Sequence, residues 1–255
     1  MTVADSLSLG LALATALVAG LVGSFALMKR MTLAGDVMSH LALPGLGLAF
    51  VWKINPLIGA AATLAIGILM IHHLRRRSGL ATETSIGVVF VAALAAGTLL
   101  TPTEDLIDAL FGGFSKIGWS GFGLGMLGCV LIAGTIYSLR HELILGIFSP
   151  DLAKTLGINL ERTELVYLAT FGLTILLGLQ FLGALLVGAM IIVPAAIGRH
   201  LARTLDQFLL LSATAGMLAV GIGFAVAREW SLALGPTIAG TASALFAVSM
   251  LKRKT

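Results

Sequence analysis

The chain has 255 residues, of which 58% are hydrophobic and only 11% are charged. That composition lies far outside the range of soluble domains and indicates an integral membrane protein. The formal net charge of +4 does not indicate nucleic acid binding, because the basic residues are scattered among loops between apolar segments. The single cysteine, Cys129, excludes both a disulfide framework and a cysteine-cluster metal site.

Nine apolar segments are long enough to be membrane spans, since roughly 17 to 25 apolar residues cross the hydrocarbon layer as a helix. They are predicted at 7–28, 34–52, 56–74, 82–100, 120–139, 164–179, 182–198, 207–227 and 234–251. The sixth and seventh meet at Gln180 with almost no loop between them, so a bent re-entrant pair, and with it eight full spans, is the alternative. The predicted fold is an all-α, polytopic membrane helix bundle that forms one transmembrane domain over residues 1–255.

The N-terminus is predicted outside and the C-terminus inside. The stretch from Met1 to Gly10 lacks the positively charged start of a cleavable signal peptide, so the first span is expected to stay in the chain. Lys and Arg favour the cytoplasmic side of a membrane. With the N-terminus outside, only Lys53, Lys116 and Arg228 of the sixteen Lys and Arg residues fall on the outer side.

The stretch Gly35–Gly45, GDVMSHLALPG, carries an acid and an imidazole inside a predicted span. Asp36 and His40 are four residues apart, so on a helix their side chains lie on one face and can share a divalent cation. An Asp at membrane depth costs roughly 2.5 to 3.5 kcal/mol on insertion scales and seldom persists there without a partner or a water-filled cavity. The alternative is that Asp36 caps a helix and His40 bonds a carbonyl, but the joint spacing favours a metal site.

Other candidate residues are weaker. Pro44 and Pro194 lie inside predicted spans, where each frees a carbonyl, and irregular backbone of this kind is tolerated where it lines a cavity. The adjacent His72 and His73 precede a run of arginines and are interpreted as a solvated span end, because neighbouring residues on a helix point in different directions.

Two segments outside the spans have the pattern of short helices. In the outer stretch 101–120 an apolar stripe alternates with acids, which predicts a helix lying in the outer interface. The inner stretch 148–158 reads FSPDLAKTLGI, in which Ser149 can cap, Pro150 suits the first helical position, Asp151 favours the positive end and Gly157 suits the terminating position. It predicts a helix of about two turns in the largest cytoplasmic loop, suited to docking a partner.

Three stretches together resemble the zinc and manganese family of ABC importer permeases. They are GDVMSHLALPGLGLAF, the FSPDLAKTLGI segment at 148–158, and GALLVGAMIIVPAAIGRHLAR at 183–203, which occur in the same order in that family. The resemblance covers the chain from about Gly23 to Lys252. It implies a type II ABC importer-like fold in a prokaryotic plasma (inner) membrane.

The resemblance also implies roles for matching residues. Asp36 and His40 match positions that line the metal pathway, with Ser39, Pro44, Glu83 and Pro194 as further pathway-lining candidates. Glu83 stands where the family more often has Asp. Ala153 and Gly157 match the spacing of the coupling helix that ABC permeases present to their ATPase. The predicted coupling residues are Ser149, Pro150, Asp151, Leu152, Ala153, Leu156 and Gly157.

The expected function is therefore the permease subunit of an ATP-driven importer of Mn²⁺, Zn²⁺ or Fe²⁺, with the cation as transported substrate and no resident cofactor. The implied partners are a second permease copy, two cytoplasmic ATP-binding subunits, an extracytoplasmic metal-binding protein and membrane lipid, without nucleic acid. The sequence has no G-x-x-x-x-G-K-[ST] phosphate loop, so ATP hydrolysis is expected on another subunit and this chain is not expected to be an enzyme.

Three other classes are less consistent with the sequence. A permease for a siderophore or cobalamin chelate is expected to lack a paired acid and imidazole. A secondary transporter usually shows inverted repeats and no isolated coupling helix. A membrane zinc protease needs H-E-x-x-H, which is absent from the sequence, and Ser39 beside His40 on one helix is poorly placed for a serine protease.

Overall fold

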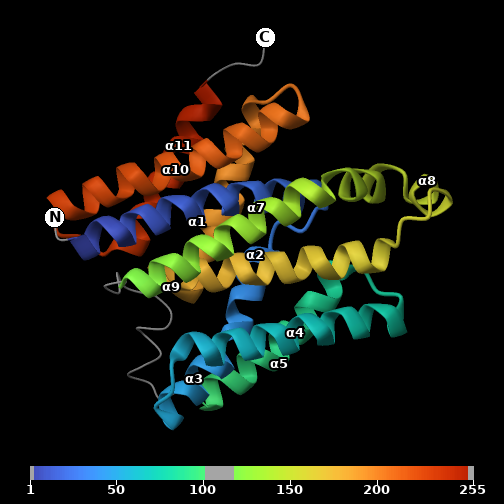
Figure 1. Cartoon of the computed structure of the whole chain (residues 1–255), viewed down its shortest axis with the longest axis horizontal. Helices are drawn as coiled ribbons and strands as arrows, with labels where there is room; N and C mark the ends of the chain where they lie inside the picture. The colour runs from blue at the N-terminus through green and yellow to red at the C-terminus, as the bar shows by residue number, and fades with distance from the viewer. Residues whose placement is uncertain (1–2, 101–117, 252–255) are drawn as a thin grey trace.

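A computed structural model of the chain describes residues 3–100 and 118–251, and all regular structure within those ranges is helical. Figure 1 shows long helices lying side by side along the long axis of the molecule. The elements are α1 (Val3–Met28), α2 (Ala34–Ser39), the 3-10 helix η1 (His40–Ala42), α3 (Leu43–Trp52), α4 (Pro56–Ser78), α5 (Thr82–Leu100), α7 (Trp119–Phe148), α8 (Pro150–Thr155), α9 (Leu160–Leu201), α10 (Leu205–Glu229) and α11 (Leu234–Leu251).

The helices form two groups that meet at α9. In the first group α1, α9 and α10 pack against one another, and α7 and α11 cover them. The second group consists of α3, α4 and α5, which lie below α9 in Figure 1. Both α2 and α4 contact α9 and so join the groups. The fully buried Phe25, Tyr167 and Phe171 lie at the centre of the first group.

Eight described segments have the length and apolar composition of a membrane span. The two spans predicted at 164–179 and 182–198 form one helical element, α9, which is broken at Gly183. Gly183 has φ 68° and ψ 177°, a conformation that glycine adopts without a Cβ clash. The part of α9 up to Ala184 is long enough to span, whereas Leu186–Leu201 is shorter, so the structure supports eight full spans rather than nine. The orientation of the chain in the membrane stays a prediction.

The predicted span 34–52 is helical throughout but not one regular helix. It is divided into α2, η1 and α3, and the change of helix type falls at His40. Pro44 explains the change, because its ring clashes with the carbonyl four residues earlier, which belongs to His40. The chain tightens there, and the His40 carbonyl accepts from the N–H of Leu43 instead.

The short helix predicted within 148–158 is present as α8, which begins at Pro150 and is followed by Gly157 at φ 77°. Ser149 occupies the N-cap position as predicted, but its side chain makes no capping hydrogen bond. The preceding span is longer than the predicted 120–139, since α7 continues to Phe148. The amphipathic helix predicted within 101–120 lies largely outside the described residues, which resume at residue 118.

Small residues allow close contact between helices. Gly45 on α3 and Gly59 on α4 touch through their backbones, so a Cβ on either one would collide with the carbonyl of the other. Gly223 on α10 meets Ile238 on α11 in a similar way. Such contacts between small residues stabilise helix pairs in lipid, where apolar side chains gain little from burial.

Candidate functional site

Asp36 lies in the first turn of α2 but does not cap that helix. The N-cap position is Leu33, and no side chain caps the helix there. Asp36 is exposed, and the three ion pairs found among the described residues all lie elsewhere. Its carboxylate is therefore available for a ligand.

His40 begins η1, one turn after Asp36, and lies close enough to Asp36 for an electrostatic interaction. Its ring centroid is 5.6 Å from that of Phe90 on α5, at an interplanar angle of 48°. The Nδ1 atom of His40 is buried and has no hydrogen-bond partner in the described part of the chain. A buried polar atom without a partner costs about 1–3 kcal/mol, which a bound cation would offset.

The segment that carries Asp36 is held against the break in α9. Ser39 is fully buried, and its Oγ lies 2.5 Å from the carbonyl oxygen of Ala184 and 2.6 Å from that of Asp36. Gly35 and Gly188 also meet, and a Cβ on Gly188 would lie 2.6 Å from the backbone nitrogen of Asp36. The backbone of Asp36 therefore rests directly on α9.

The other four pathway candidates lie at four different places. Ser39 is buried between α2 and α9, so it does not share the exposure of Asp36. Pro44 is buried in the first turn of α3, just after η1, and Pro194 is buried in α9 beyond Gly188. Glu83 lies at the start of α5 and lines a cavity at one end of the helices.

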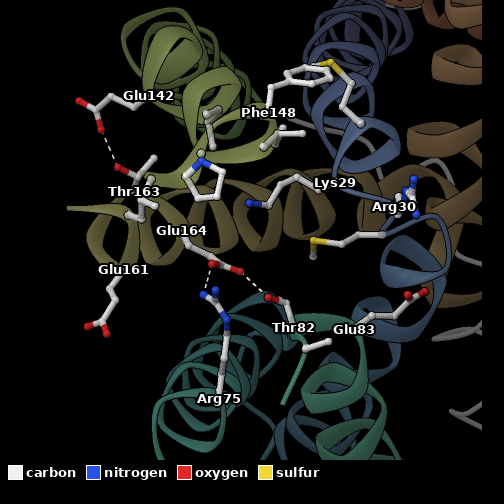
Figure 2. Close-up of a pocket in the computed structure, with 18 of the residues that line it drawn as sticks. Lys29, Arg30, Arg75, Thr82, Glu83, Glu142, Phe148, Glu161, Thr163 and Glu164 are labelled. Atoms are coloured by element: carbon white, nitrogen blue, oxygen red, sulfur yellow. Dashed lines mark hydrogen bonds and ion pairs between the residues drawn. The ribbon is translucent and has the colours of Figure 1, made fainter. Parts of the chain in front are cut away.

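This cavity has a volume of about 870 Å³ and lies between the ends of α1, α4, α5, α7, α8 and α9 (Figure 2). Because these helix ends carry the basic residues predicted to be cytoplasmic, we expect the cavity to open inward. Its charged lining consists of Lys29, Arg30, Arg75, Glu83, Glu142, Lys154, Glu161 and Glu164.

Glu164, in the second turn of α9, joins three helices across this cavity (Figure 2). One of its carboxylate oxygens receives the guanidinium of Arg75 from α4, and the other accepts the hydroxyl of Thr82 at the start of α5. The Glu164 side chain is only 8% exposed. Burial of a carboxylate is tolerated when charged and polar donors satisfy it in this way.

Two more interactions fix the start of α9. Thr163 donates a hydrogen bond of 2.5 Å to Glu142 on α7. Arg76 and Glu161 form an ion pair of 3.2 Å between two exposed side chains. The first turns of α9 are thus bonded to both groups of helices.

Lys29 extends into the cavity from the end of α1 (Figure 2). Its ammonium lies 5.7 Å from the centre of the Tyr167 ring, and no ion pair of Lys29 is found within the described ranges. Burial, and to a lesser extent the nearby Arg75, lower the pKa of Lys29 to about 8. At neutral pH the cavity therefore holds a partly desolvated positive charge.

The short helix α8 adjoins the cavity, which Pro150 and Lys154 help to line. Leu152 and Leu156 are 51% and 62% exposed, so they form an apolar surface that the chain itself leaves uncovered. Ala153 differs from the expectation that it faces a partner directly, because its methyl group is fully covered by its own chain. A small side chain fits this covered position.

Within the described ranges no three His, Cys, Asp or Glu side chains gather as a metal site. The structure thus brings Asp36 and His40 together without a third ligand of these types from the same chain. Sequence reasoning did not identify Arg75, Glu164 or the Ser39–Ala184 contact. A signal existed for Glu164, because a carboxylate at the start of a predicted span requires a partner.

Residues 7–253 match the model of the ABC 3 transport family. The manganese import system permease protein ScaB of Streptococcus parasanguinis is 31% identical over 246 residues, which cover 93% of this chain and 86% of ScaB. The high-affinity zinc uptake system membrane protein ZnuB of Haemophilus influenzae is 28% identical, with 95% of this chain and 97% of ZnuB covered. Among solved structures, PsaBC of Streptococcus pneumoniae in complex with Fab matches with a TM-score of 0.84 and 28% identity, over 98% of this chain and 92% of that one.

Proposed function

The chain belongs to the ABC 3 transport family, and on this premise we propose that it is the permease subunit of an ATP-driven importer of a divalent transition-metal cation, Mn²⁺ or Zn²⁺. Its relatives are membrane subunits of manganese and zinc uptake systems, and the chain has the multi-pass helical form of a plasma-membrane permease. The transported ion is the substrate of this subunit, which performs no catalysis of its own.

One observation carries the proposal: the buried Nδ1 of His40 has no hydrogen-bond partner among the described residues, one turn from the exposed carboxylate of Asp36. A neutral imidazole nitrogen and carboxylate oxygens are ligands that Zn²⁺ and Mn²⁺ both accept. We therefore assign Asp36 and His40 as ligands that the cation meets on its way through the membrane.

A second copy of the chain is part of the proposal. One imidazole and one carboxylate are too few for a transition metal, which commonly takes four or more ligands. Because no third His, Cys, Asp or Glu joins the pair within the described ranges, two copies that face each other would supply two nitrogens and two carboxylates. This set of ligands suits Mn²⁺ and Zn²⁺ alike, so coordination geometry and metal supply decide which of the two is transported.

The remaining partners follow from the surfaces of the chain. The exposed Leu152 of α8 and Leu156 just after it provide an apolar contact for a cytoplasmic ATP-binding subunit. Each permease copy takes one such subunit, and an extracytoplasmic metal-binding protein delivers the cation to the outer side.

The test is uptake of Mn²⁺ and Zn²⁺, measured separately, by the complete importer reconstituted in liposomes with its ATP-binding subunit and its metal-binding protein. We expect Asp36→Asn and His40→Ala each to reduce uptake by at least the ~10- to 100-fold that loss of even an outer-shell partner costs a metal site. Assembly with the ATP-binding subunit should persist, because Asp36 is exposed and His40 Nδ1 has no hydrogen-bond partner among the described residues.

The matched control replaces His72 and His73 by Gln. These histidines lie in the last turns of α4, and His73 is exposed, so their loss should leave uptake unchanged. Parental uptake by the Asp36→Asn and His40→Ala variants would disprove the ligand assignment. Uptake of neither cation by the parent importer would disprove the proposed substrate.

A further inference from the structure

We propose that Ser39 is the residue that couples the metal site to the ATPase contact, through the hydrogen bond from its Oγ to the carbonyl oxygen of Ala184 on α9. This inference rests on the proposed function and assigns Ser39 a positioning role, distinct from that of a cation ligand. The mechanical link is α9 itself, which begins next to α8 and reaches the metal site at its break.

The first part of α9 is a rod of suitable length. It begins at Leu160, five residues after the end of α8, and continues without a break to Gly183. A helix of that length extends about 35 Å, which is enough to cross the hydrocarbon layer. A displacement of the start of α9 is therefore carried by a continuous ladder of backbone hydrogen bonds as far as the break at Gly183, the residue before Ala184.

The start of α9 is also bonded to α5, so the two helices are expected to move together there. Glu164 accepts the Thr82 hydroxyl at the start of α5, and α5 carries Phe90, whose ring packs on His40. A shift of the start of α9 thus reaches His40 through α5 and reaches Asp36 through Ser39. Both candidate ligands are connected to the same end of α9.

The Ser39 hydroxyl can exchange one hydrogen-bond acceptor for another. A serine hydroxyl carries one proton, yet Ser39 Oγ lies within hydrogen-bond distance of two carbonyl oxygens, 2.5 Å from Ala184 and 2.6 Å from Asp36. Donation to Ala184 joins α2 to α9, whereas donation to Asp36 stays within the helix. The hydroxyl can give up its hydrogen bond to Ala184 and donate to the Asp36 carbonyl instead. The contact between α2 and α9 can therefore open without leaving the buried hydroxyl unsatisfied, which keeps the cost low.

The packing around this hydrogen bond leaves no room to absorb a shift. Gly35 lies against Gly188, and a Cβ on Gly188 would lie 2.6 Å from the nitrogen and 2.8 Å from the Cα of Asp36. Because no side chain stands between the two backbones, movement of α9 at this point must displace Asp36 or separate α2 from α9.

The experiment measures cations imported per ATP hydrolysed by the complete importer in liposomes, for the parent, Ser39→Ala and Ser39→Cys. We expect Ser39→Ala to keep ATP hydrolysis and to lower the ratio by roughly three- to tenfold, the range set by one intramolecular hydrogen bond. Ser39→Cys occupies a similar volume but donates only weakly, so its ratio should lie between the other two. It also provides the measurement if Ser39→Ala fails to assemble.

Ser24→Ala is the matched control. Ser24 is also fully buried on a membrane helix, but its hydroxyl donates a hydrogen bond of 2.8 Å to the Gly20 carbonyl of its own helix, and no second acceptor for it is found among the described residues. Its loss should leave the ratio of cations to ATP unchanged, even if it lowers stability.

Three results would overturn the inference: parental ratios for both Ser39 variants, an equal fall in the Ser24 control, or a fall of import and ATP hydrolysis in the same proportion. The proposed function fails in a different way, through parental uptake by the Asp36→Asn and His40→Ala variants. The two ideas are thus tested separately in one assay.

Discussion

The guanidinium of Arg75 on α4 meets the carboxylate of Glu164 on α9 at a point where the Glu164 side chain is only 8% exposed. The two residues belong to different helix groups, so this ion pair joins the groups at the end of the molecule that we expect to face the cytoplasm. If the two groups separated on that side, the ion pair between Arg75 and Glu164 would have to break, or the two side chains would have to move together.

Loss of Arg75 is expected to destabilise the fold. Arg75→Ala leaves the buried Glu164 carboxylate with only the Thr82 hydroxyl, so the free energy of unfolding should fall by about 1.5–3 kcal/mol, the range for hydrogen bonds to charged groups. The measurement is unfolding of the purified protein in mixed micelles. The neighbouring Arg76→Ala removes an ion pair whose side chains are 60% and 59% exposed, so it should cost less than about 1 kcal/mol. Equal losses in the two variants would contradict the structural role of the buried pair.

Stability should depend on pH through Lys29. Its pKa in the folded protein is lowered to about 8, chiefly by burial, from the ordinary lysine value of 10.5. Between these values the unfolded chain binds more protons at this site than the folded chain, so the contribution of Lys29 to stability rises with pH from about 8 to 10.5. Below pH 8 the folded state carries the full cost of the desolvated charge.

Lys29→Met should therefore stabilise the protein most at pH 7, and its advantage should shrink as the pH rises through that window. The measurement compares the unfolding free energies of variant and parent across the pH range. Lys154→Met, at a side chain that is 70% exposed, is the matched lysine-to-methionine control. A constant difference between Lys29→Met and the parent at every pH would exclude this role for Lys29.

The contact between α3 and α4 should depend on Gly45. A Cβ at this position would collide with the Gly59 carbonyl, so Gly45→Ala should cost about 1–3 kcal/mol by overpacking. At Gly87 on α5 nothing lies within 4 Å of an added Cβ, and Gly87→Ala should be neutral or stabilise by up to about 1 kcal/mol. The measurement is again unfolding in mixed micelles. A larger loss of unfolding free energy for Gly87→Ala than for Gly45→Ala would contradict the close contact of α3 and α4.

The docking surface of α8 should depend on Leu152. Leu152→Asp puts a charge on an exposed apolar contact and should reduce co-purification of the ATP-binding subunit. Leu232, between α10 and α11, is exposed to a similar extent, 52% against 51%, but lies on the side predicted to face outward. Leu232→Asp should therefore leave co-purification unchanged. Loss of the ATP-binding subunit from both variants, or from neither, would remove α8 from the docking role.

Local patterns in the sequence were sufficient for the main elements. Long apolar segments predict spans because a helix must satisfy its backbone inside hydrocarbon, and eight such segments are found in the structure. Pro150 and Gly157 bound α8 because they restrict or permit particular backbone angles, whatever surrounds them. The spacing of Asp36 and His40 is likewise a local property of one turn of chain, and it predicted a candidate ligand pair.

Local patterns could not predict which distant residues meet. The sequence predicted a bend or a boundary between two spans at Gln180, whereas the structure breaks α9 at Gly183, next to the place where α2 packs on α9. The hydroxyl of Ser39 reaches a carbonyl 145 residues away, and Arg75 reaches a carboxylate 89 residues away. Neither partner is determined by helix periodicity, because periodicity fixes which residues share a face of one helix, whereas contact between helices depends on how the whole bundle packs.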